Sequence, residues 1–232
     1  LSWGEQNIIL RTAPKGITVK NAHDMSREFR VLTKLETTFN YAPKPILLCE
    51  DEKVIGRPFY LMQKVDGYIP RKEFPFTINP AQARKICEEL INVHIAMHEI
   101  DIEETGLISL GDPIGYIRRQ VDGWSKRYIA AKTNKSLAAN SLMNWLEANI
   151  PEDHHHSLIH NDYKLDNVVL SAEDSTKISA VLDWEMTTVG SPLMDLGCSL
   201  AYWIEKDDPS ELQAIRMMPT HVQGMMTRDE II

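Results

Sequence analysis

The sequence predicts an α+β protein with two unequal parts, a small mixed β/α part and a larger, mainly helical part. Two observations lead to this prediction. Short apolar strands flank a single amphipathic helix in residues 1–66, whereas helices and three short strands, two of them in a hairpin, fill residues 67–232. The length of 232 residues suits one large domain or two small ones.

The first part begins with an apolar stretch typical of a strand. Asp24 is a suitable helix N-cap, and Phe29, Leu32 and Leu35 follow it at helical spacing. In order, we expect a strand over 6–12, a helix from 24 to about 39, strands over 46–49 and 59–65, and a charged turn at 50–53 between these strands. The pattern predicts a small sheet with one helix packed against it.

The second part follows a stretch with several prolines, which we interpret as a linker beginning at Asp66. Asn79 and Pro80 form an N-cap and first-turn pair, and the apolar residues after them recur at steps of three and four. We expect helices from 80, over 113–131, 136–149 and 192–204, short strands at 158–159, 168–170 and 178–182, and a helix start at 227–230.

Composition and charge restrict the classes of function. Lys and Arg number 25 against 33 Asp and Glu, which gives a net charge of −8 and argues against a nucleic-acid partner. No apolar run reaches the roughly 18 residues of a membrane span, so we expect no membrane partner. Three widely spaced cysteines favour a reducing compartment, and we expect a cytoplasmic protein.

The residues whose side chains are suited to catalysis lie between and after the last strands. His160, Asp162, Lys164 and Asn167 form one loop, and Asp183 follows the second strand of the hairpin. Phosphoryl transfer needs a carboxylate for the acceptor hydroxyl, charge neutralisation and oxygen ligands for Mg²⁺, which Asp162, Lys164 and Asn167 could supply. The hairpin should return Asp183, a second metal ligand, to the same end. Protein kinases show the same order of catalytic loop and metal-binding aspartate.

A purely structural loop is the alternative, because His, Asp and Asn are common in loops. The joint pattern is more specific than its parts, since apolar strands flank the loop and a second aspartate follows at the right topological place. We therefore favour a catalytic loop.

With these motifs the sequence resembles the aminoglycoside phosphotransferase-like (choline/aminoglycoside kinase) family, and within it the kinase domain associated with acyl-CoA dehydrogenases. The resemblance covers nearly the whole chain. It is carried by residues 22–32 (AHDMSREFRVL), 56–62 (GRPFYLM), 115–128 (GYIRRQVDGWSKRY), 160–167 (HNDYKLDN), 181–185 (VLDWE) and 190–196 (GSPLMDL).

The resemblance implies a protein-kinase-like two-lobe fold, with the N-lobe over 1–66 and the C-lobe over 67–232. It implies that Asp162 is the catalytic base and that Asn167 and Asp183 bind Mg²⁺. Arg11 would bind ATP phosphates and pair with Glu28; by position alone, these two could equally be a surface pair. Gln63, Lys64 and Val65 would form the hinge that receives adenine through backbone groups, although position alone would make them plain core.

Other charged residues near the loop have more than one interpretation. Glu185 could touch a second metal ion, orient Asp183 or cap the next helix. We expect Asp195 to hold the loop backbone and His160 to brace the loop. We expect His94 and His98 to be packed or surface residues rather than metal ligands.

The sequence departs from the family pattern at both ends. The small-residue loop that covers the nucleotide phosphates is not visible before Arg11, and the C-terminal helices are expected to be missing. The prediction is an ATP-dependent phosphotransferase acting on a small-molecule hydroxyl, possibly a hydroxyacyl group. The alternatives are an amino-alcohol, sugar or aminoglycoside kinase and a non-catalytic nucleotide-binding pseudokinase. ATP or GTP preference and oligomeric state stay open.

Overall fold

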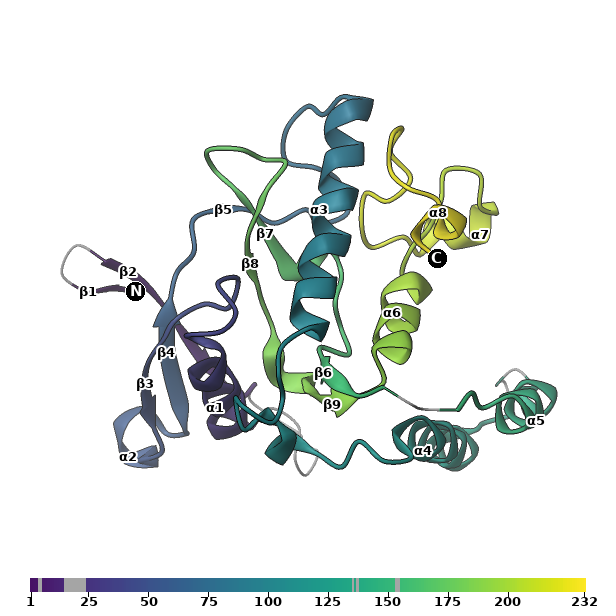
Figure 1. Cartoon of the computed structure of the whole chain (residues 1–232), viewed down its shortest axis with the longest axis horizontal. Coiled ribbons are helices and arrows are strands. Elements are labelled where there is room, and N and C mark those ends of the chain that lie inside the picture. Colours follow the sequence, from purple (N-terminus) through teal and green to yellow (C-terminus); the bar gives the residue numbers. More distant parts are fainter. Residues whose placement is uncertain (4–5, 15–23, 135, 137, 153–154) are drawn as a thin grey trace.

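A four-stranded antiparallel sheet with one helix against it precedes a mainly helical part that carries two small sheets (Figure 1). The computed structural model describes residues 1–3, 6–14, 24–134, 136, 138–152 and 155–232. Residues 22 and 23 of the first family motif lie outside the described residues.

The first sheet has the order β1-β2-β4-β3, with β1 at Ser2–Trp3, β2 at Gln6–Thr12, β4 at Phe59–Gln63 and β3 at Pro45–Cys49. The sequence analysis did not anticipate β1. It pairs antiparallel with β2, so a two-stranded hairpin leads into the strand that carries Arg11. Residues 4 and 5, between β1 and β2, are not among the described residues.

Helix α1, at Met25–Leu35, packs against this sheet because its buried residues recur at helical spacing. The Asp24 side chain caps it by accepting a hydrogen bond from the Arg27 N–H at 3.0 Å. The helix ends before the predicted Phe39. Here the chain turns, and the N–H of Phe39 bonds to the carbonyl of Leu35 at 2.9 Å.

The charged segment predicted to be a turn is instead the start of a short helix, α2, at Glu52–Ile55. Its two ends explain the difference. The Asp51 side chain accepts from the Lys53 N–H, and Gly56 closes the helix with a left-handed backbone, φ 85°.

The segment predicted to be a linker also contains a strand. Strand β5, at Gly67–Tyr68, pairs with β7, at Val168–Ser171, and β7 pairs with β8, at Ile178–Val181. Two residues carry too weak a periodic pattern to be recognised as a strand, and pairing with β7 defines them.

The second part surrounds helix α3, at Pro80–His98, whose start is fixed by the predicted Asn79 cap in a capping box with Gln82. The other helices are α4 (Tyr116–Ala131), α5 (Asn140–Ala148), α6 (Pro192–Ala201), α7 (Ser210–Ala214) and α8 (Arg228–Ile231). The remaining elements are the 3₁₀ turns η1 (Leu107–Leu110), η2 (Leu165–Asn167) and η3 (Trp184–Met186) and the strand pair β6 (Ser157–Ile159) and β9 (Thr188–Gly190).

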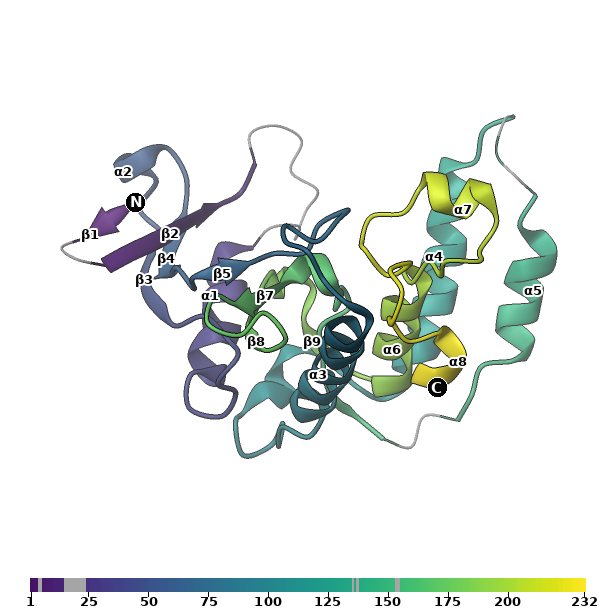
Figure 2. The same ribbon diagram turned by 90° about the horizontal axis from the view of Figure 1, so that it is seen from above.

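Helices α4 and α5 lie on the side of the molecule away from the first sheet (Figure 2). One buried apolar cluster joins the two parts, including Leu32 of α1, Tyr60 of β4, Ile86 of α3 and Trp184 of η3. This cluster fixes β2 and α1 relative to the loops that follow β6 and β8. None of the described helices has the length and apolarity that crossing a bilayer requires.

Candidate active site

The Asp162 carboxylate is held at both oxygens in the loop between β6 and β7. The Lys164 Nζ lies 2.9 Å from Asp162 Oδ1, and Asn167 donates through Nδ2 to Asp162 Oδ2 at 2.8 Å and to the Asp162 carbonyl at 2.9 Å. The side chain of Asp162 remains 23% exposed. The carboxylate is therefore fixed in orientation and still reachable by a bound molecule.

The Lys164 amine is enclosed, with its side chain only 10% exposed. It lies 4.5 Å from the centre of the Tyr202 ring and 3.9 Å from Asp166 Oδ1. Partial burial alone would lower the pKa of Lys164, but the hydrogen bond and charge of Asp162 raise it above its ordinary value. The amine therefore stays protonated. The sequence analysis missed the contacts with Tyr202 and Asp166.

The β7–β8 hairpin brings Asp183 next to Asn167. Val168 pairs with Val181, and beyond this pair the Leu182 N–H bonds to the Asn167 carbonyl at 2.7 Å. Because the strands are antiparallel, residue 183 lies at the same end of the hairpin as the loop containing Asp162.

Arg11, Glu28 and Asp183 form one ion-paired chain. The Arg11 Nη2 lies 3.2 Å from Glu28 Oε2 and 2.7 Å from Asp183 Oδ1. Glu28 is 1% exposed and also accepts from the Trp184 N–H at 3.2 Å. Burial opposes the charge of Arg11, but the attraction of Glu28 and Asp183 holds its pKa above the ordinary value. The surface-pair interpretation of Arg11 and Glu28 is therefore wrong.

Two site residues have a left-handed backbone, Asn161 with φ 64° and Asp183 with φ 67°. They are the two non-glycine residues with positive φ in the described part of the chain. This conformation is uncommon outside glycine, although Asn and Asp tolerate it best, and it persists where the surroundings impose it. The fold thus imposes an unusual backbone on both sides of the site.

Asp195 of α6 holds the backbone of the loop that carries Asp162, as predicted from the sequence. Its carboxylate is fully buried and accepts from the His160 N–H at 2.9 Å and the Asn161 N–H at 2.7 Å. The Nε2 atoms of His94 and His98 each lie 3.0 Å from Asp195 Oδ2. Burial opposes ionisation, but these hydrogen bonds hold the pKa of Asp195 well below its usual range.

His160 braces the loop from inside. It is fully buried, and its Nε2 lies 3.0 Å from the Leu182 carbonyl, which joins the loop to the residue before Asp183. Ser191 occupies the N-cap position of α6 and makes no side-chain cap hydrogen bond, so a cap from Glu185 stays a prediction. The two other interpretations of Glu185 stay predictions.

A cavity of about 350 Å³ opens between the first sheet and the β7–β8 hairpin. Ile9 and Met62 line it from the sheet, Val169 and Leu182 line it from the hairpin, and Arg11 also lines it. Such a volume and a mainly apolar wall with a few polar groups are typical of small-molecule sites. Since Arg11 contacts Asp183, the cavity is continuous with the charged groups.

The predicted hinge, residues 63–65, also lines this cavity. The Gln63 N–H bonds to the Lys44 carbonyl at 2.8 Å, and the Lys64 N–H bonds to the Asn7 carbonyl at 3.3 Å. The N–H of Val65 has no acceptor among the described residues.

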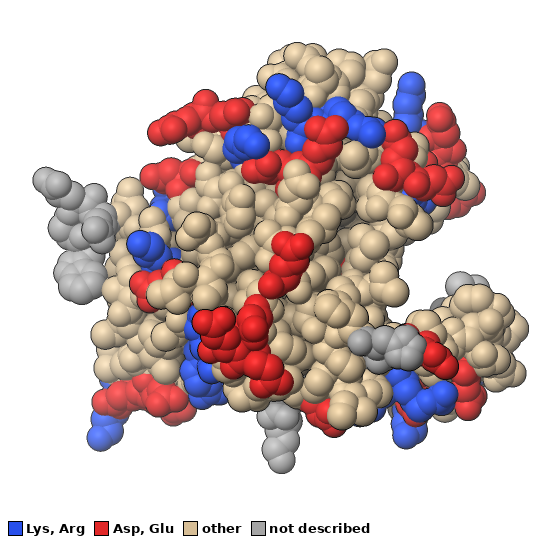
Figure 3. All heavy atoms as spheres, in the orientation of Figure 1, with Lys and Arg blue, Asp and Glu red and all other residues tan. Residues whose placement is uncertain are grey.

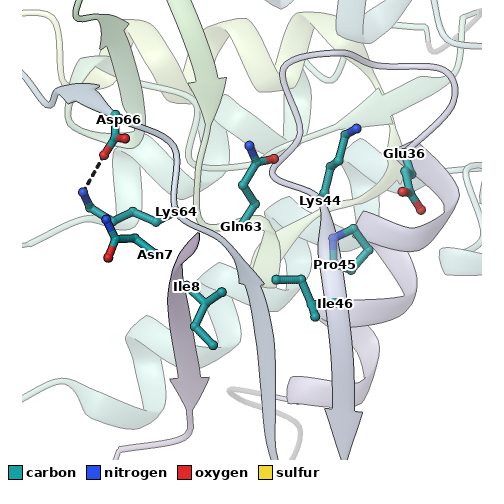
Figure 4. Close-up of a pocket in the computed structure, with 9 residues that line it drawn as sticks. All are labelled: Asn7, Ile8, Glu36, Lys44, Pro45, Ile46, Gln63, Lys64 and Asp66. Carbon is teal, nitrogen blue, oxygen red and sulfur yellow. Dashed lines mark hydrogen bonds and ion pairs between the residues drawn. The ribbon is translucent and has the colours of Figure 1, made fainter. Parts of the chain in front are cut away.

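A larger groove of about 600 Å³ lies behind the hinge, lined by the side chains in Figure 4. The Gln63 side chain points into it, and Lys64 pairs there with Asp66 at 2.5 Å (Figure 4). The groove contains neither Arg11 nor a residue of the β7–β8 hairpin, whereas the smaller cavity is lined by Arg11 and by Leu182, which directly precedes Asp183. We therefore place the candidate site in the smaller cavity, to which the hinge can present its backbone.

We expect acidification from about pH 7.5 to about pH 5.5 to lower the melting temperature. Burial lowers the pKa of His94 and of His160, so both are neutral in the folded protein, whereas the unfolded chain takes up these protons near pH 6.5. Below that pH the unfolded state binds more protons. The free energy of unfolding should then fall by up to about 1.4 kcal/mol per pH unit for each histidine.

Thermal denaturation across this range measures the effect, and His94→Gln should show a shallower pH dependence than the wild type. The pKa of His221 is also lowered by burial and acts in the same direction. A melting temperature that does not change across the range would contradict the buried neutral histidines.

On the face seen in Figure 3, acidic and basic side chains are interspersed. This agrees with the net charge of −8.

Comparisons with known proteins agree with the geometry. The model of a phosphotransferase enzyme family matches residues 1–224. The chain is 35% identical over 227 residues to acyl-CoA dehydrogenase family member 10 of Mus musculus, covering 97% of this chain and 21% of that protein. It is 37% identical over 211 residues to member 11 of Homo sapiens, covering 90% and 27%. It thus spans about a quarter of the length of these relatives.

Solved structures show the same fold. A candidate aminoglycoside phosphotransferase from Ralstonia eutropha superposes with a TM-score of 0.80 at 32% identity, over 98% of this chain and 67% of that one. Aminoglycoside phosphotransferase APH(4)-Ia, solved with ADP and hygromycin B, gives a TM-score of 0.59 at 16% identity, over 87% and 66%. The predicted family resemblance and the protein-kinase-like fold are confirmed.

Proposed function

Because the chain belongs to the phosphotransferase enzyme family, we propose that it transfers the γ-phosphoryl group of ATP to a hydroxyl group of a small molecule. The observation that carries this proposal is the Asp162 carboxylate, fixed by Lys164 and Asn167 and still exposed, beside the chain of Asp183, Arg11 and Glu28. These are the parts that positioning and charge stabilisation of phosphoryl transfer need.

ATP would occupy the cavity between the first sheet and the hairpin. Adenine would lie between Ile9 and Met62 on one side and Val169 and Leu182 on the other, and the hinge would bond to it through the Val65 N–H. A guanidinium can bind phosphate in a bidentate manner, which suits Arg11 to the phosphates. Kinases of the same fold have been solved with ADP and with ATP, which supports a nucleotide in this cavity.

The donor atoms at the hairpin end fit Mg²⁺. Asn167 donates to Asp162 through Nδ2, so its Oδ1 lies on the opposite side of the amide, and Asp183 offers a carboxylate. Mg²⁺ prefers such hard oxygen ligands. Asn167 and Asp183 would hold the ion, which when bound supplies neutralisation of the phosphate oxygens.

In the proposed reaction, Asp162 orients the acceptor hydroxyl and takes its proton. The hydroxyl oxygen forms a bond to the γ-phosphorus as the bond from this phosphorus to the bridging oxygen of ADP breaks. Lys164, held protonated beside Asp162, neutralises negative charge on the transferring group. Glu28 holds Arg11 at the cavity.

We further propose a hydroxylated acyl group, possibly as a thioester, as the acceptor. The support is that the curated relatives are named acyl-CoA dehydrogenase family members. We expect a panel of hydroxyacyl thioesters, aminoglycosides, choline and homoserine to show ADP release only with thioesters. Turnover of an aminoglycoside and of no thioester would reject this acceptor. If no acceptor of the panel led to ADP release and no nucleotide raised the melting temperature, a non-catalytic protein would be favoured.

We expect Val65→Pro to weaken ATP binding about tenfold, the loss of one hydrogen bond of about 1.4 kcal/mol. Val65→Ala, which keeps the N–H, should bind like the wild type. The measurement is the thermal shift with ATP and Mg²⁺. Saturation of the wild type at about 100 times Kd should add about 2.7 kcal/mol, roughly 5–10 °C.

Melting of the ligand-free variants controls for folding. If Val65→Ala weakened ATP binding as much as Val65→Pro, the side chain rather than the N–H would be responsible, and the assignment of the hinge donor would be wrong.

A further inference from the structure

Three side chains of types that can bind metal ions lie together next to the backbone of residues 160 and 161. His94 and His98 lie one turn apart on α3, and Asp195 faces them from α6. Each histidine Nε2 is 3.0 Å from Asp195 Oδ2, and the three atoms lie within 4.8 Å of one another. We propose that His94, His98 and Asp195 form a binding site for a divalent transition-metal ion of the zinc class. This proposal is independent of the proposed phosphotransfer.

The spacing of the donor atoms is close to that of a zinc site. Zinc binds imidazole nitrogen and carboxylate oxygen at about 2.0–2.2 Å, so tetrahedral ligands lie roughly 3.3 Å apart. The two nitrogen–oxygen separations of 3.0 Å need only a small expansion. Two histidines at i and i+4 on one helix face are a known way of presenting two ligands to zinc.

The chemical state of the ligands also suits a metal ion. His94 is 3% exposed, and burial lowers its pKa, so its imidazole is neutral near pH 7, which is the form that binds metals. The Asp195 carboxylate stays ionised at the same pH because its pKa is well below the usual range. One carboxylate and two imidazoles give a donor set that zinc accepts.

An open cleft of about 620 Å³ gives access to the site. It is lined by His98, by His155 and His156 and by Pro192 at the start of α6. The His98 side chain is 15% exposed, so an ion can reach it from solvent. Water in the cleft can supply the fourth ligand, as in zinc sites with three protein ligands.

The site is separate from the ATP cavity, with which it has no residue in common. It is connected to the catalytic loop through Asp195, whose Oδ1 accepts from the Asn161 N–H at 2.7 Å and whose Oδ2 also accepts from the His160 N–H at 2.9 Å. In metal sites, a carboxylate that binds the ion commonly also accepts hydrogen bonds from neighbouring groups, as Asp195 does from these two N–H groups.

The test is a metal titration of the whole chain after removal of metal by a chelator. We expect one equivalent of Zn²⁺ to bind in equilibrium dialysis, and one equivalent of Co²⁺ to give the visible absorption of a four- or five-coordinate ion. His98→Gln and His94→Gln each remove a ligand and should weaken metal binding by at least about a hundredfold. Loss of a group that only hydrogen-bonds to a ligand already weakens metal binding by up to about a hundredfold.

Two controls separate this site from others. His221→Gln removes a histidine outside the cluster, and Asp183→Asn removes a carboxylate of the ATP site; both should bind Co²⁺ with unchanged stoichiometry and spectrum. Melting curves verify that the variants fold. His98→Gln should disturb folding less than His94→Gln, because His98 is partly exposed. Absence of stoichiometric binding by the wild type, or binding unchanged in folded His98→Gln, would overturn the proposal and leave the cluster as a hydrogen-bonded brace.

Discussion

Replacing Asp162 with asparagine should lower kcat by about 10²–10⁴-fold and leave the affinity for ATP nearly unchanged. In the proposed reaction the carboxylate acts on the acceptor hydroxyl, whereas the cavity proposed for ATP is lined by other residues. In the variant, Lys164 and Asn167 can still contact the side chain, but one position now carries an NH₂ group and no strong base remains. Steady-state kinetics and nucleotide titration together give the two values.

Asp183→Asn is the matched variant, because it removes the charged group expected to bind Mg²⁺. It should weaken Mg·ATP binding and abolish turnover together. It also leaves Arg11 with Glu28 as its remaining ion pair. If Asp162→Asn retained full phosphotransfer activity, the assignment of the catalytic loop would be wrong, and the proposed function would fail with it.

Asp195→Asn should lower the free energy of unfolding by about 3 kcal/mol, or roughly 6–12 °C in melting temperature. The buried carboxylate accepts backbone N–H groups from His160 and Asn161, and both histidines of α3 also point at it. An amide has one acceptor oxygen, so its NH₂ must face one of these donors. A buried donor left without an acceptor costs about 1–3 kcal/mol.

The matched control is Asp207→Asn, an exposed aspartate that follows α6 in the chain. It should change the free energy of unfolding by less than about 0.5 kcal/mol. Thermal and urea denaturation measure both variants. Equal stability of Asp195→Asn and the wild type would show that the buried carboxylate does not hold the loop.

Elements with local signals could be predicted from the sequence. The strand over 6–12 and the helix starts after Asp24 and Asn79 are present because strand patterns, caps and helical spacing depend on neighbours within a few residues. The loop of Asp162 and the return of the hairpin to Asp183 depend on a short stretch as well. The pairing of Arg11 with Glu28 came from the family motif and not from any local signal.

Only the tertiary structure decided how these parts meet. Arg11 contacts Asp183 across 172 positions, and His94, His98 and two loop N–H groups share the Asp195 carboxylate. Strand β5 exists because β7 lies beside it. Such convergence results from the packing of elements around a common core, which periodicity and caps do not encode. The sequence by itself therefore determined which residues could do chemistry, and the fold decided which of them touch.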